Sequence, residues 1–369
     1  MSRSHIAKES LGAVLFILPN FIGFLIFTSL PVLASMVISF TSWDVFTPPK
    51  FIGIQNYVDL LSFHPIDINL VPSTSQKLLL TFFLLLCFSI PTWLVLTFYN
   101  YSKEQRKRSL ICFIVMTIAI LILIPVAGAT FRFWTANDPR FWQYCFNTFF
   151  LMLAIPIAMF SSLLLAIVMN QKLRGIYIYR LIYYLPTICS GVGIYILWMW
   201  IYNPDYGLIN SCLRGMFHIE GPKWLMDINW AKPALMFMGF WGAVGGFNCV
   251  LYLAALQGIS QELYEASEID GANWWQKFWN IIWPLVSPTT FFIFIMSIIS
   301  GFQAGFDMAY IMTQGGPAGA TTSISFYIYD QAFRNFEMGY ASAISWVLFV
   351  LVFGVTILNY RIGGKVVHY

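Results

Sequence analysis

The chain alternates between long runs of apolar residues and shorter polar segments. About 20 consecutive apolar residues are enough for a helix to cross the hydrocarbon core of a bilayer. Eight such runs occur, at about residues 11–40, 78–98, 110–130, 146–169, 181–201, 233–257, 289–312 and 341–360. The pattern therefore predicts an all-α integral membrane protein with eight transmembrane helices.

Prolines modify two of the predicted helices. Pro19 and Pro31 fall inside the first run, which is longer than a bilayer requires, so a tilt or a kink is expected there. Pro284 and Pro288 precede the seventh run, and proline suits the first turn of a helix. We therefore expect both prolines to mark the start of the seventh helix.

The distribution of Lys and Arg predicts the orientation, because cytoplasmic loops of membrane proteins are enriched in these residues. With the N-terminus inside, twelve of the twenty Lys and Arg residues fall on short cytoplasmic segments, among them the run Lys103–Arg108. Both termini and the polar segment 260–284 are therefore predicted to be cytoplasmic. The segment Ser323–Tyr340 then lies outside, either as an amphipathic interfacial helix or as a loop with its rings among lipid headgroups.

The amino-acid composition also indicates a membrane protein. Hydrophobic residues make up 59% of the 369 residues and charged residues 10%, against about 25% charged residues in soluble domains. Lipid must therefore cover much of the surface. The net charge of +4 is attributed to the orientation bias, and no nucleic-acid binding is expected. The run 11–40 is too long for the apolar part of a cleavable signal peptide, so none is expected.

The residue sets needed for common catalytic chemistry are missing from the sequence. No Gly-x-x-x-x-Gly-Lys-Ser/Thr loop occurs, so the chain itself is not expected to bind ATP. The four histidines are dispersed over loops and no catalytic triad is readable, so we expect no metal, no cofactor and no enzymatic activity. Cys145 and Cys212 both fall on the predicted external side, and a disulfide between them stays open.

A few polar residues interrupt the sixth and seventh predicted helices, which are otherwise apolar. At membrane depth such groups need a partner or a water-filled cavity. Aromatic residues close to them in sequence are suited to stack on the C–H faces of sugars. Hydrogen bonds between helices and lipid-facing rings are the alternative interpretation. The candidates for a substrate pathway are Asn248, Gln303, Asp307, Trp241, Phe247 and Phe306.

The segment 260–284 is polar and acidic and lies between two apolar runs. Ser260 is suited to cap a short helix, Glu262 favours its first turn, and Gly271 suits the left-handed turn that ends one. Small residues on this helix allow it to approach a partner closely, and Glu265 is available to pair with a basic residue there. The segment is therefore expected to meet a basic partner, with Lys277 as its own cation.

The same segment resembles the cytoplasmic signature of permease subunits of binding-protein-dependent ABC importers. That signature reads Glu-Ala-Ala, two residues, Asp-Gly-Ala, five residues, Phe, two residues, Ile, one residue, Leu-Pro. Its counterpart here is Glu265-Ala266-Ser267, Asp270-Gly271-Ala272, Phe278, Ile281 and Trp283-Pro284. Ser267 replaces the second Ala and Trp283 replaces Leu, and both replacements are mild.

Further stretches extend the resemblance over about residues 11–62 and 141–361. They are Phe40–Asp44, Phe51–Tyr57, Tyr202–Gly207, Gly245–Asn248, Ala255–Gln257, Thr313–Pro317 and Gly339–Ser342. They are similar to the oligosaccharide and glycerol-3-phosphate branch, which includes the larger maltose permease subunit. Residues 65–138 depart from six-span relatives and carry two extra predicted helices, which either face lipid or contact a partner subunit.

The resemblance implies one transmembrane permease domain over residues 1–369, in the bacterial plasma membrane. Its implied partners are a second homologous permease, two ATPase subunits and an extracytoplasmic binding protein that delivers an oligosaccharide or related carbohydrate. The coupling residues that it implies toward the ATPases are Glu265, Ala266, Ser267, Asp270 and Gly271.

Two other classes of protein remain as alternatives. A self-contained secondary carrier or channel would also explain polar residues at membrane depth. Against an ion-coupled carrier stands the presence of a single carboxylate, Asp307, inside the predicted helices. A non-transporting scaffold would explain the cytoplasmic segment but not the polar residues in the sixth and seventh helices.

Overall fold

A computed structural model describes residues 16–65, 134–171, 174–189 and 191–363. The predicted helices at 78–98 and 110–130, and the basic run Lys103–Arg108, lie outside the described residues. Within the described part, five helices are long and apolar enough to cross a membrane: Phe16–Ile38, Pro139–Met169, Ala231–Gln257, Trp274–Gln303 and Met338–Ile357. The helical class of fold is therefore confirmed, and these five helices overlap five of the eight predicted runs.

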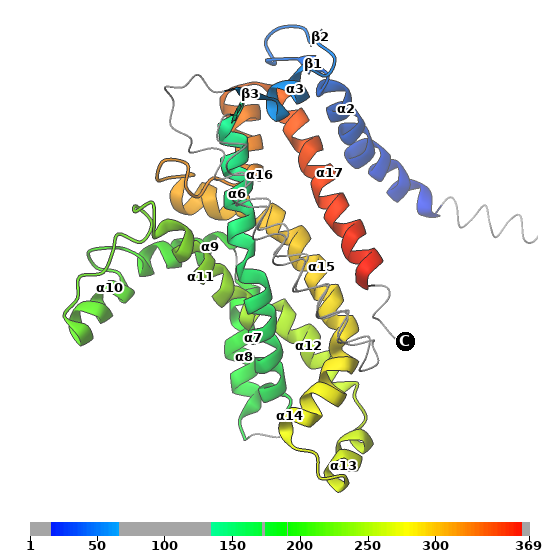
Figure 1. The fold of residues 1–369 in the computed structure, drawn as a ribbon, viewed down its shortest axis with the longest axis vertical. Helices are drawn as coiled ribbons and strands as arrows, with labels where there is room; N and C mark the ends of the chain where they lie inside the picture. The colour runs from blue at the N-terminus through cyan, green and yellow to red at the C-terminus, as the bar shows by residue number, and fades with distance from the viewer. Residues whose placement is uncertain (1–15, 66–133, 172–173, 190, 364–369) are drawn as a thin grey trace, which may run out of the picture. The chain divides into compact units, whose positions relative to one another are not determined.

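The described chain is almost entirely helical, with two short strand pairs (Figure 1). The α-helices are α2 Leu30–Ile38, α3 Gln55–Leu61, α6 Pro139–Met152, α7 Ala154–Met169, α8 Ile176–Ile188, α9 Gly191–Ile201, α10 Leu208–Cys212, α11 Ala231–Val244, α12 Phe247–Gln257, α13 Gln261–Ile269, α14 Trp274–Lys277, α15 Trp283–Met308, α16 Ile324–Tyr329 and α17 Met338–Gly363. The π-helical turns are η1 Leu25–Ser29, η2 Leu213–Phe217, η3 Phe278–Ile282, η4 Ala309–Thr313 and η5 Asp330–Arg334. Strand β1 Thr41–Ser42 pairs antiparallel with β2 Lys50–Phe51, and β3 Phe63–Pro65 pairs antiparallel with β4 Trp134–Ala136.

The chain divides into two compact units, residues 1–62 with 328–349 and residues 63–327 with 350–369. In the first unit, the buried side chain of Asn56 donates to the carbonyl oxygens of Ser39 at 2.8 Å and Thr41 at 3.0 Å. Gly339, in the first turn of α17, lies so close to Thr41 that a Cβ there would collide with its carbonyl oxygen. These contacts tie the segment after the first apolar helix to the start of α17.

The second unit is built around α7, α12 and α15. A buried apolar cluster joins these helices, with Leu163 and Ala166 from α7, Tyr252 from α12, and Val286 and Ile293 from α15. All five side chains are almost completely buried, which is what helices packed on one another inside a protein require. Figure 1 places α13 and α14 at the opposite end of this unit from α6.

The run predicted as one helix at 181–201 is two helices, and that prediction is wrong. α8 ends at Ile188, and Cys189 takes an extended backbone conformation (φ −71°, ψ 148°). α9 follows from Gly191 and has only 11 residues, too few to cross a bilayer alone. Gly191 and Gly193 lower the helix propensity of this stretch, so the apolar run did not ensure a continuous helix.

The sixth predicted helix is present, but a short non-helical step at Gly245 and Gly246 divides it into α11 and α12. A Cβ on Gly245 would lie 2.9 Å from the carbonyl oxygen of Tyr183, so only glycine allows α8 to approach this closely. At this step the carbonyl oxygen of Ala243 loses the backbone N–H donor that a continuous helix would supply. The Oγ of Ser162 on α7 donates to this oxygen instead, at 3.0 Å.

The seventh predicted helix begins earlier than the prolines indicated. α14, η3 and α15 follow one another without a loop, and Pro284 lies in the first turn of α15. Pro288, however, lies inside that helix and has no N–H for the carbonyl four residues earlier, that of Pro284. Ser287 Oγ donates to this carbonyl at 2.7 Å. The prediction that Pro288 marks a helix start is therefore wrong, because a neighbouring hydroxyl replaces the missing donor.

Two smaller expectations about the external side are also settled. The first part of Ser323–Tyr340 is buried in protein rather than lying at the membrane surface: Ile324 and Phe326 are each 1% exposed. The side chain of Ser325 donates to the carbonyl oxygen of Phe302 at 2.6 Å, which holds this segment on α15. Cys145 and Cys212 are both free cysteines, so the disulfide left open from the sequence is absent.

We predict that Gly245→Ala destabilises the protein because its Cβ would press on the Tyr183 backbone. Overpacking of this kind typically costs about 1–3 kcal/mol. The measurement is the Tm of the detergent-purified protein. Gly242→Ala is the matched control, since a Cβ there meets no atom within 4 Å. Equal Tm values for the two variants would show that the Gly245 contact is not tight.

Candidate functional site

The helix predicted within segment 260–284 is α13 Gln261–Ile269. Ser260 takes the N-cap position with extended backbone angles (φ −63°, ψ 140°), but its side chain makes no capping hydrogen bond. The expectation that Ser260 would cap the helix is therefore met by its backbone only. Glu262 lies in the first turn, where a carboxylate is favoured by the partial positive charge of the helix N-terminus.

The end of α13 is built as the sequence predicts. Gly271 has a φ of +72°, the left-handed conformation that favours glycine. The amide of Asp270 donates to Ala266 O at 3.0 Å and that of Ala272 donates to Ser267 O at 2.9 Å, so the last carbonyls of the helix are paired. The chain then turns back toward the membrane-spanning helices.

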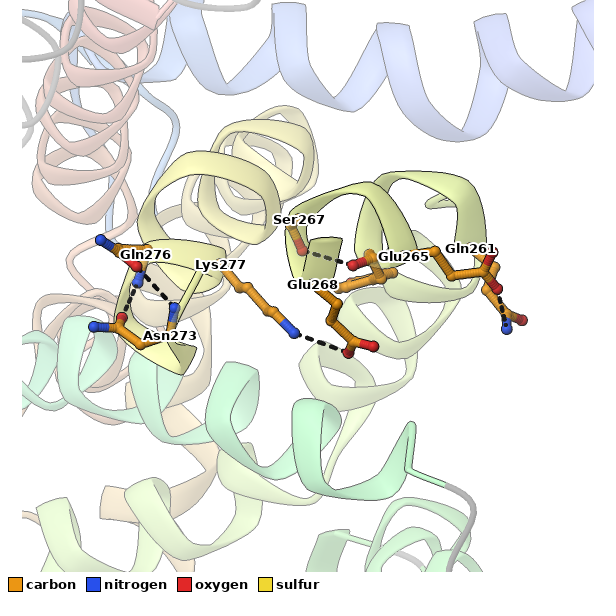
Figure 2. A network of polar contacts seen from close by, with 8 residues as sticks. Gln261, Glu265, Ser267, Glu268, Asn273, Gln276 and Lys277 are labelled. Carbon is orange, nitrogen blue, oxygen red and sulfur yellow. Dashed lines mark hydrogen bonds and ion pairs between the residues drawn. The ribbon is translucent and has the colours of Figure 1, made fainter. Parts of the chain in front are cut away.

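A capping box starts α14 directly after this turn. The Asn273 side chain accepts from the Gln276 amide at 2.9 Å, and the Gln276 side chain accepts from the Asn273 amide at 2.7 Å (Figure 2). Two amides at the start of α14 are satisfied in this way. The angle at which the chain enters α14 and α15 is therefore defined by local hydrogen bonds.

The cation of the segment links the two helices. Figure 2 shows Lys277 Nζ of α14 reaching Glu268 Oε1 of α13 at 2.9 Å. The Glu268 side chain is 67% exposed, so this pair contributes at most about 1 kcal/mol to stability. Its role is geometric, because it closes the turn around Gly271.

The inner face of α13 packs on the core of the second unit. Ser267 is the buried residue of this helix, at 8% exposed, and its Oγ donates to the carbonyl oxygen of Tyr264 at 2.7 Å. Tyr264 is partly buried and packs against the apolar cluster of α7, α12 and α15. A serine is tolerated at position 267 because its hydroxyl is satisfied within the helix.

The outer face of α13 is open and acidic. Glu262, Glu265 and Asp270 are exposed, as is Ala266 between them. Glu265 Oε1 accepts from Gln261 Nε2 at 2.9 Å, one turn earlier on the same helix (Figure 2). This contact orients the carboxylate and leaves it accessible. The structure thus places Glu265, Ala266 and Asp270 on the surface, with Ser267 beneath them and Gly271 in the turn.

Tryptophan side chains surround the start of α14, a feature that the sequence analysis did not single out. Trp274, Trp275 and Trp279 are each about half exposed, between 50% and 59%. Trp275 stacks on Trp279 with centroids 6.3 Å apart, and Trp283 contacts Trp279 at 5.9 Å. The spacing of four residues between 275, 279 and 283 was the available signal, since such residues share one helical face.

The pathway candidates on α15 share one face of the helix. Gln303 and Asp307 are exposed and lie one turn apart, whereas Phe302 and Ala309 on the other side are buried, at 2% and 1% exposed. Phe306 is partly buried and stacks on Tyr310 with centroids 5.5 Å apart, so one of its faces is already occupied.

Two further residues belong to the exposed face of α15 and were missed from the sequence. Ser300 is exposed and precedes Gln303 by three residues, and Tyr310 is 39% exposed and follows Asp307 by three. Spacings of three, four and three residues keep one helical face, so this periodicity was a readable signal. The face is defined by Ser300, Gln303, Asp307 and Tyr310.

The other pathway candidates lie on α11 and α12. Trp241 and Phe247 are 59% and 63% exposed, and Asn248 is partly buried in the first turn of α12. Within the described residues, no hydrogen bond joins Asn248 to Gln303 or Asp307. The structure therefore places Gln303 and Asp307 on one face of α15 and Asn248 on α12, without a hydrogen bond between them in the described part of the chain.

A cavity of about 150 Å³ lies elsewhere in the second unit, between α6, α7, α11 and α15. Its lining is mostly apolar, with Leu235, Phe240 and Gly301 among the residues, and includes the hydroxyls of Thr148 and Ser323. None of the pathway candidates lines it. The exposed polar face of α15 is therefore not part of this cavity and remains open on the side away from the core.

Comparison with known sequences gives consistent results. The family described as "Binding-protein-dependent transport system inner membrane component" matches residues 149–368, which include α13 and α15. The "Probable ABC transporter permease protein YesP" of Bacillus subtilis (strain 168) is 30% identical over 372 residues, covering 100% of this chain and 95% of that protein.

Two further relatives carry transport substrates in their names. The "Lactose transport system permease protein LacF" of Rhizobium radiobacter is 34% identical, covering 69% of this chain and 85% of that protein. The "sn-glycerol-3-phosphate transport system permease protein UgpA" of Agrobacterium fabrum (strain C58 / ATCC 33970) is 32% identical, covering 60% of this chain and 74% of that protein.

Solved structures share the fold. A chain of a bacterial ABC transporter involved in the import of the acidic polysaccharide alginate has a TM-score of 0.68 at 19% identity, covering 98% of both chains. A chain of a bacterial alginate ABC transporter, in complex with an alginate pentasaccharide-bound periplasmic protein, has a TM-score of 0.57 at 22% identity. This second match covers 70% of the present chain and 95% of the other.

We predict that Gly271→Ala loosens the end of α13, because a left-handed backbone costs a residue with a Cβ about 1–2 kcal/mol. A Cβ at this position meets no atom within 4 Å, so backbone strain is the only penalty. Amide hydrogen exchange at residues 270–273 should become about fivefold to thirtyfold faster. Gly271→Asn is the matched control, since Asn tolerates this conformation better. Equal acceleration in both variants would contradict the explanation.

Proposed function

Since the chain belongs to the family of inner membrane components of binding-protein-dependent transport systems, we propose that it forms, with a second permease, the route for a carbohydrate through an ABC importer. The chain is a multi-pass membrane permease subunit and not itself an enzyme. The observation that carries the proposal is the family signature on the accessible face of α13, at one end of the spanning helices. The alternative of a self-contained carrier or channel is not favoured by this membership.

The proposed partner at α13 is one of two separate ATPase subunits. Exposed Glu265 offers a carboxylate to a basic side chain, and exposed Ala266 lets the partner come close. Tyr264 and Ser267 join the helix to the core of the second unit, and the pair of Lys277 with Glu268 closes the turn. A displacement of α13 when the ATPases close on ATP is therefore passed to α12 and α15 by direct packing.

The proposed substrate route runs along the exposed face of α15 and the neighbouring helices. Gln303 at the end of the spanning helix Trp274–Gln303 and Asp307 one turn beyond it supply polar groups, and Trp241 and Phe247 supply exposed rings for the apolar faces of a sugar. Asn248 and Phe306 complete the set expected from the sequence. A second permease facing this side would enclose the route, and an extracytoplasmic binding protein would deliver the oligosaccharide or related carbohydrate.

The proposed topology keeps both termini and α13 in the cytoplasm, with a single permease domain over residues 1–369. In this arrangement the five described spans, the two additional predicted helices within 65–138, and one crossing made jointly by α8 and α9 give eight spans. The support is the excess of Lys and Arg on the short segments assigned to the inside. The segment from Tyr202 to Lys232, with α10 and η2, is then external.

Glu265→Lys is expected to abolish ATP-driven carbohydrate uptake while membrane insertion persists, because charge reversal replaces attraction by repulsion at the ATPase contact. The measurement combines uptake with copurification of the ATPase from the same cells. Glu220→Lys is the control, since it makes the same charge change at an exposed position of the segment assigned to the outside. Unchanged uptake and copurification in Glu265→Lys would remove the case for coupling through α13.

Cysteine labelling tests the orientation in a background without native cysteines. Tyr206→Cys, at a position 64% exposed in the segment assigned to the outside, should react with an impermeant thiol reagent added to intact cells. Ile269→Cys, at a position 87% exposed on α13, should react only after the membrane is permeabilised. The reverse pattern would invert the topology and place α13 outside the cell.

A further inference from the structure

The helix α15 has two faces of different character. Ile298, Phe302 and Ala309 point into the second unit and are at most 3% exposed. On the other face, Phe292 and Met296 are exposed and apolar. The C-terminal part of this face, formed by Ser300, Gln303, Asp307 and, in the following η4, Tyr310, is open as well. All four of its members carry a hydrogen-bonding group. A face of this kind is unsuited to lipid, so it borders the polar route proposed above.

Asp307 gives this face a charge. Among the described long apolar helices, α15 alone carries a carboxylate. Neither of the two ion pairs in the described part of the chain includes Asp307. Within the described part of the chain the carboxylate takes part in no ion pair, so it contributes a negative charge to the proposed route.

We propose that Asp307 selects against anionic carbohydrates, so that the imported substrate is a neutral or positively charged saccharide; this rests on the proposed function. Like charges repel about four times more strongly at the effective dielectric constant of protein sites, ~20, than in water, ~80. A carboxylate, phosphate or sulfonate passing Asp307 meets this repulsion. It also brings acceptor oxygens to an acceptor, so no hydrogen bond offsets the cost.

A neutral saccharide meets the opposite situation on the same face. Its hydroxyl groups donate to the Asp307 carboxylate, and a hydrogen bond to a charged acceptor is stronger than one between neutral groups. The Gln303 amide donates and accepts one turn away, and the exposed ring of Tyr310 offers an apolar surface to sugar C–H groups. The similarity to relatives leaves the charge of the substrate open, since their named substrates include neutral lactose and anionic sn-glycerol-3-phosphate. The Asp307 carboxylate favours a substrate that is not anionic.

The test uses the complete importer, with its second permease, ATPases and binding protein, in proteoliposomes. The probes are panels of radiolabelled disaccharides in matched pairs, each neutral sugar with its aldonic or uronic acid, together with one amino-sugar disaccharide. The wild type should import neutral or cationic members and discriminate against each acid by about tenfold or more. Asp307→Asn should reduce that discrimination by about tenfold. Asp307→Glu should keep it, and Gln303→Glu, which adds a second charge one turn away, should increase it.

Four outcomes would contradict the proposal. Charge selection by Asp307 is overturned if the wild type imports the acids at rates similar to the neutral sugars. It is also overturned if Asp307→Asn leaves the ratio of neutral-sugar import to acid import unchanged. Loss of subunit copurification in Asp307→Asn, with retention in Asp307→Glu, would show that the carboxylate pairs with a cation of the second permease and does not select substrate. If no saccharide of either class is imported, the proposed function itself fails and the inference fails with it.

Discussion

Lipid offers no hydrogen-bonding groups, and this constraint governs the rest of the structure. Every backbone N–H and C=O at membrane depth must find a partner within the protein, which makes a continuous helix the default. At two of the interruptions in the described helices, a serine supplies the lost donor. Ser287 serves the carbonyl left unpaired by Pro288, and Ser162 serves Ala243 beside the step at Gly245. These breaks shape the helices without leaving the carbonyls unpaired.

The coupling segment is a rigid projection of the spanning helices rather than a tethered loop. Its fold is defined by the left-handed turn at Gly271 and by the capping box of Asn273 and Gln276. Tyr264 and Ser267 anchor its inner face on the core, while Glu265 faces outward. In the proposed importer, a subunit that has no ATP site of its own receives the work of ATP hydrolysis through this exposed surface. Because α13 is packed on the core through Tyr264 and Ser267, a displacement of α13 is transmitted to the spanning helices with little loss.

The proposed substrate route needs more than a single chain. Gln303 and Asp307 lie on a face of α15 that this subunit's core does not cover, and the cavity inside the second unit is lined by other, mostly apolar residues. A route formed with a second permease accounts for both observations. It also explains why the charge on Asp307 matters, since a carboxylate on such a face acts on whatever passes rather than on a partner within the subunit.

The sequence by itself determined the helical membrane class, the approximate positions of the five described spans, and α13 with its turn at Gly271. These follow from apolar run length and from a local turn that glycine favours. It did not determine where the helices break. The step at Gly245 depends on contacts with Tyr183 and Ser162, and the passage of α15 through Pro288 depends on Ser287. The break at the extended Cys189 coincides with the low helix propensity of Gly191 and Gly193. Only the tertiary structure decided that the face of α15 with Gln303 and Asp307 is open while the face with Phe302 is covered, because composition alone does not specify which side of an apolar helix is covered.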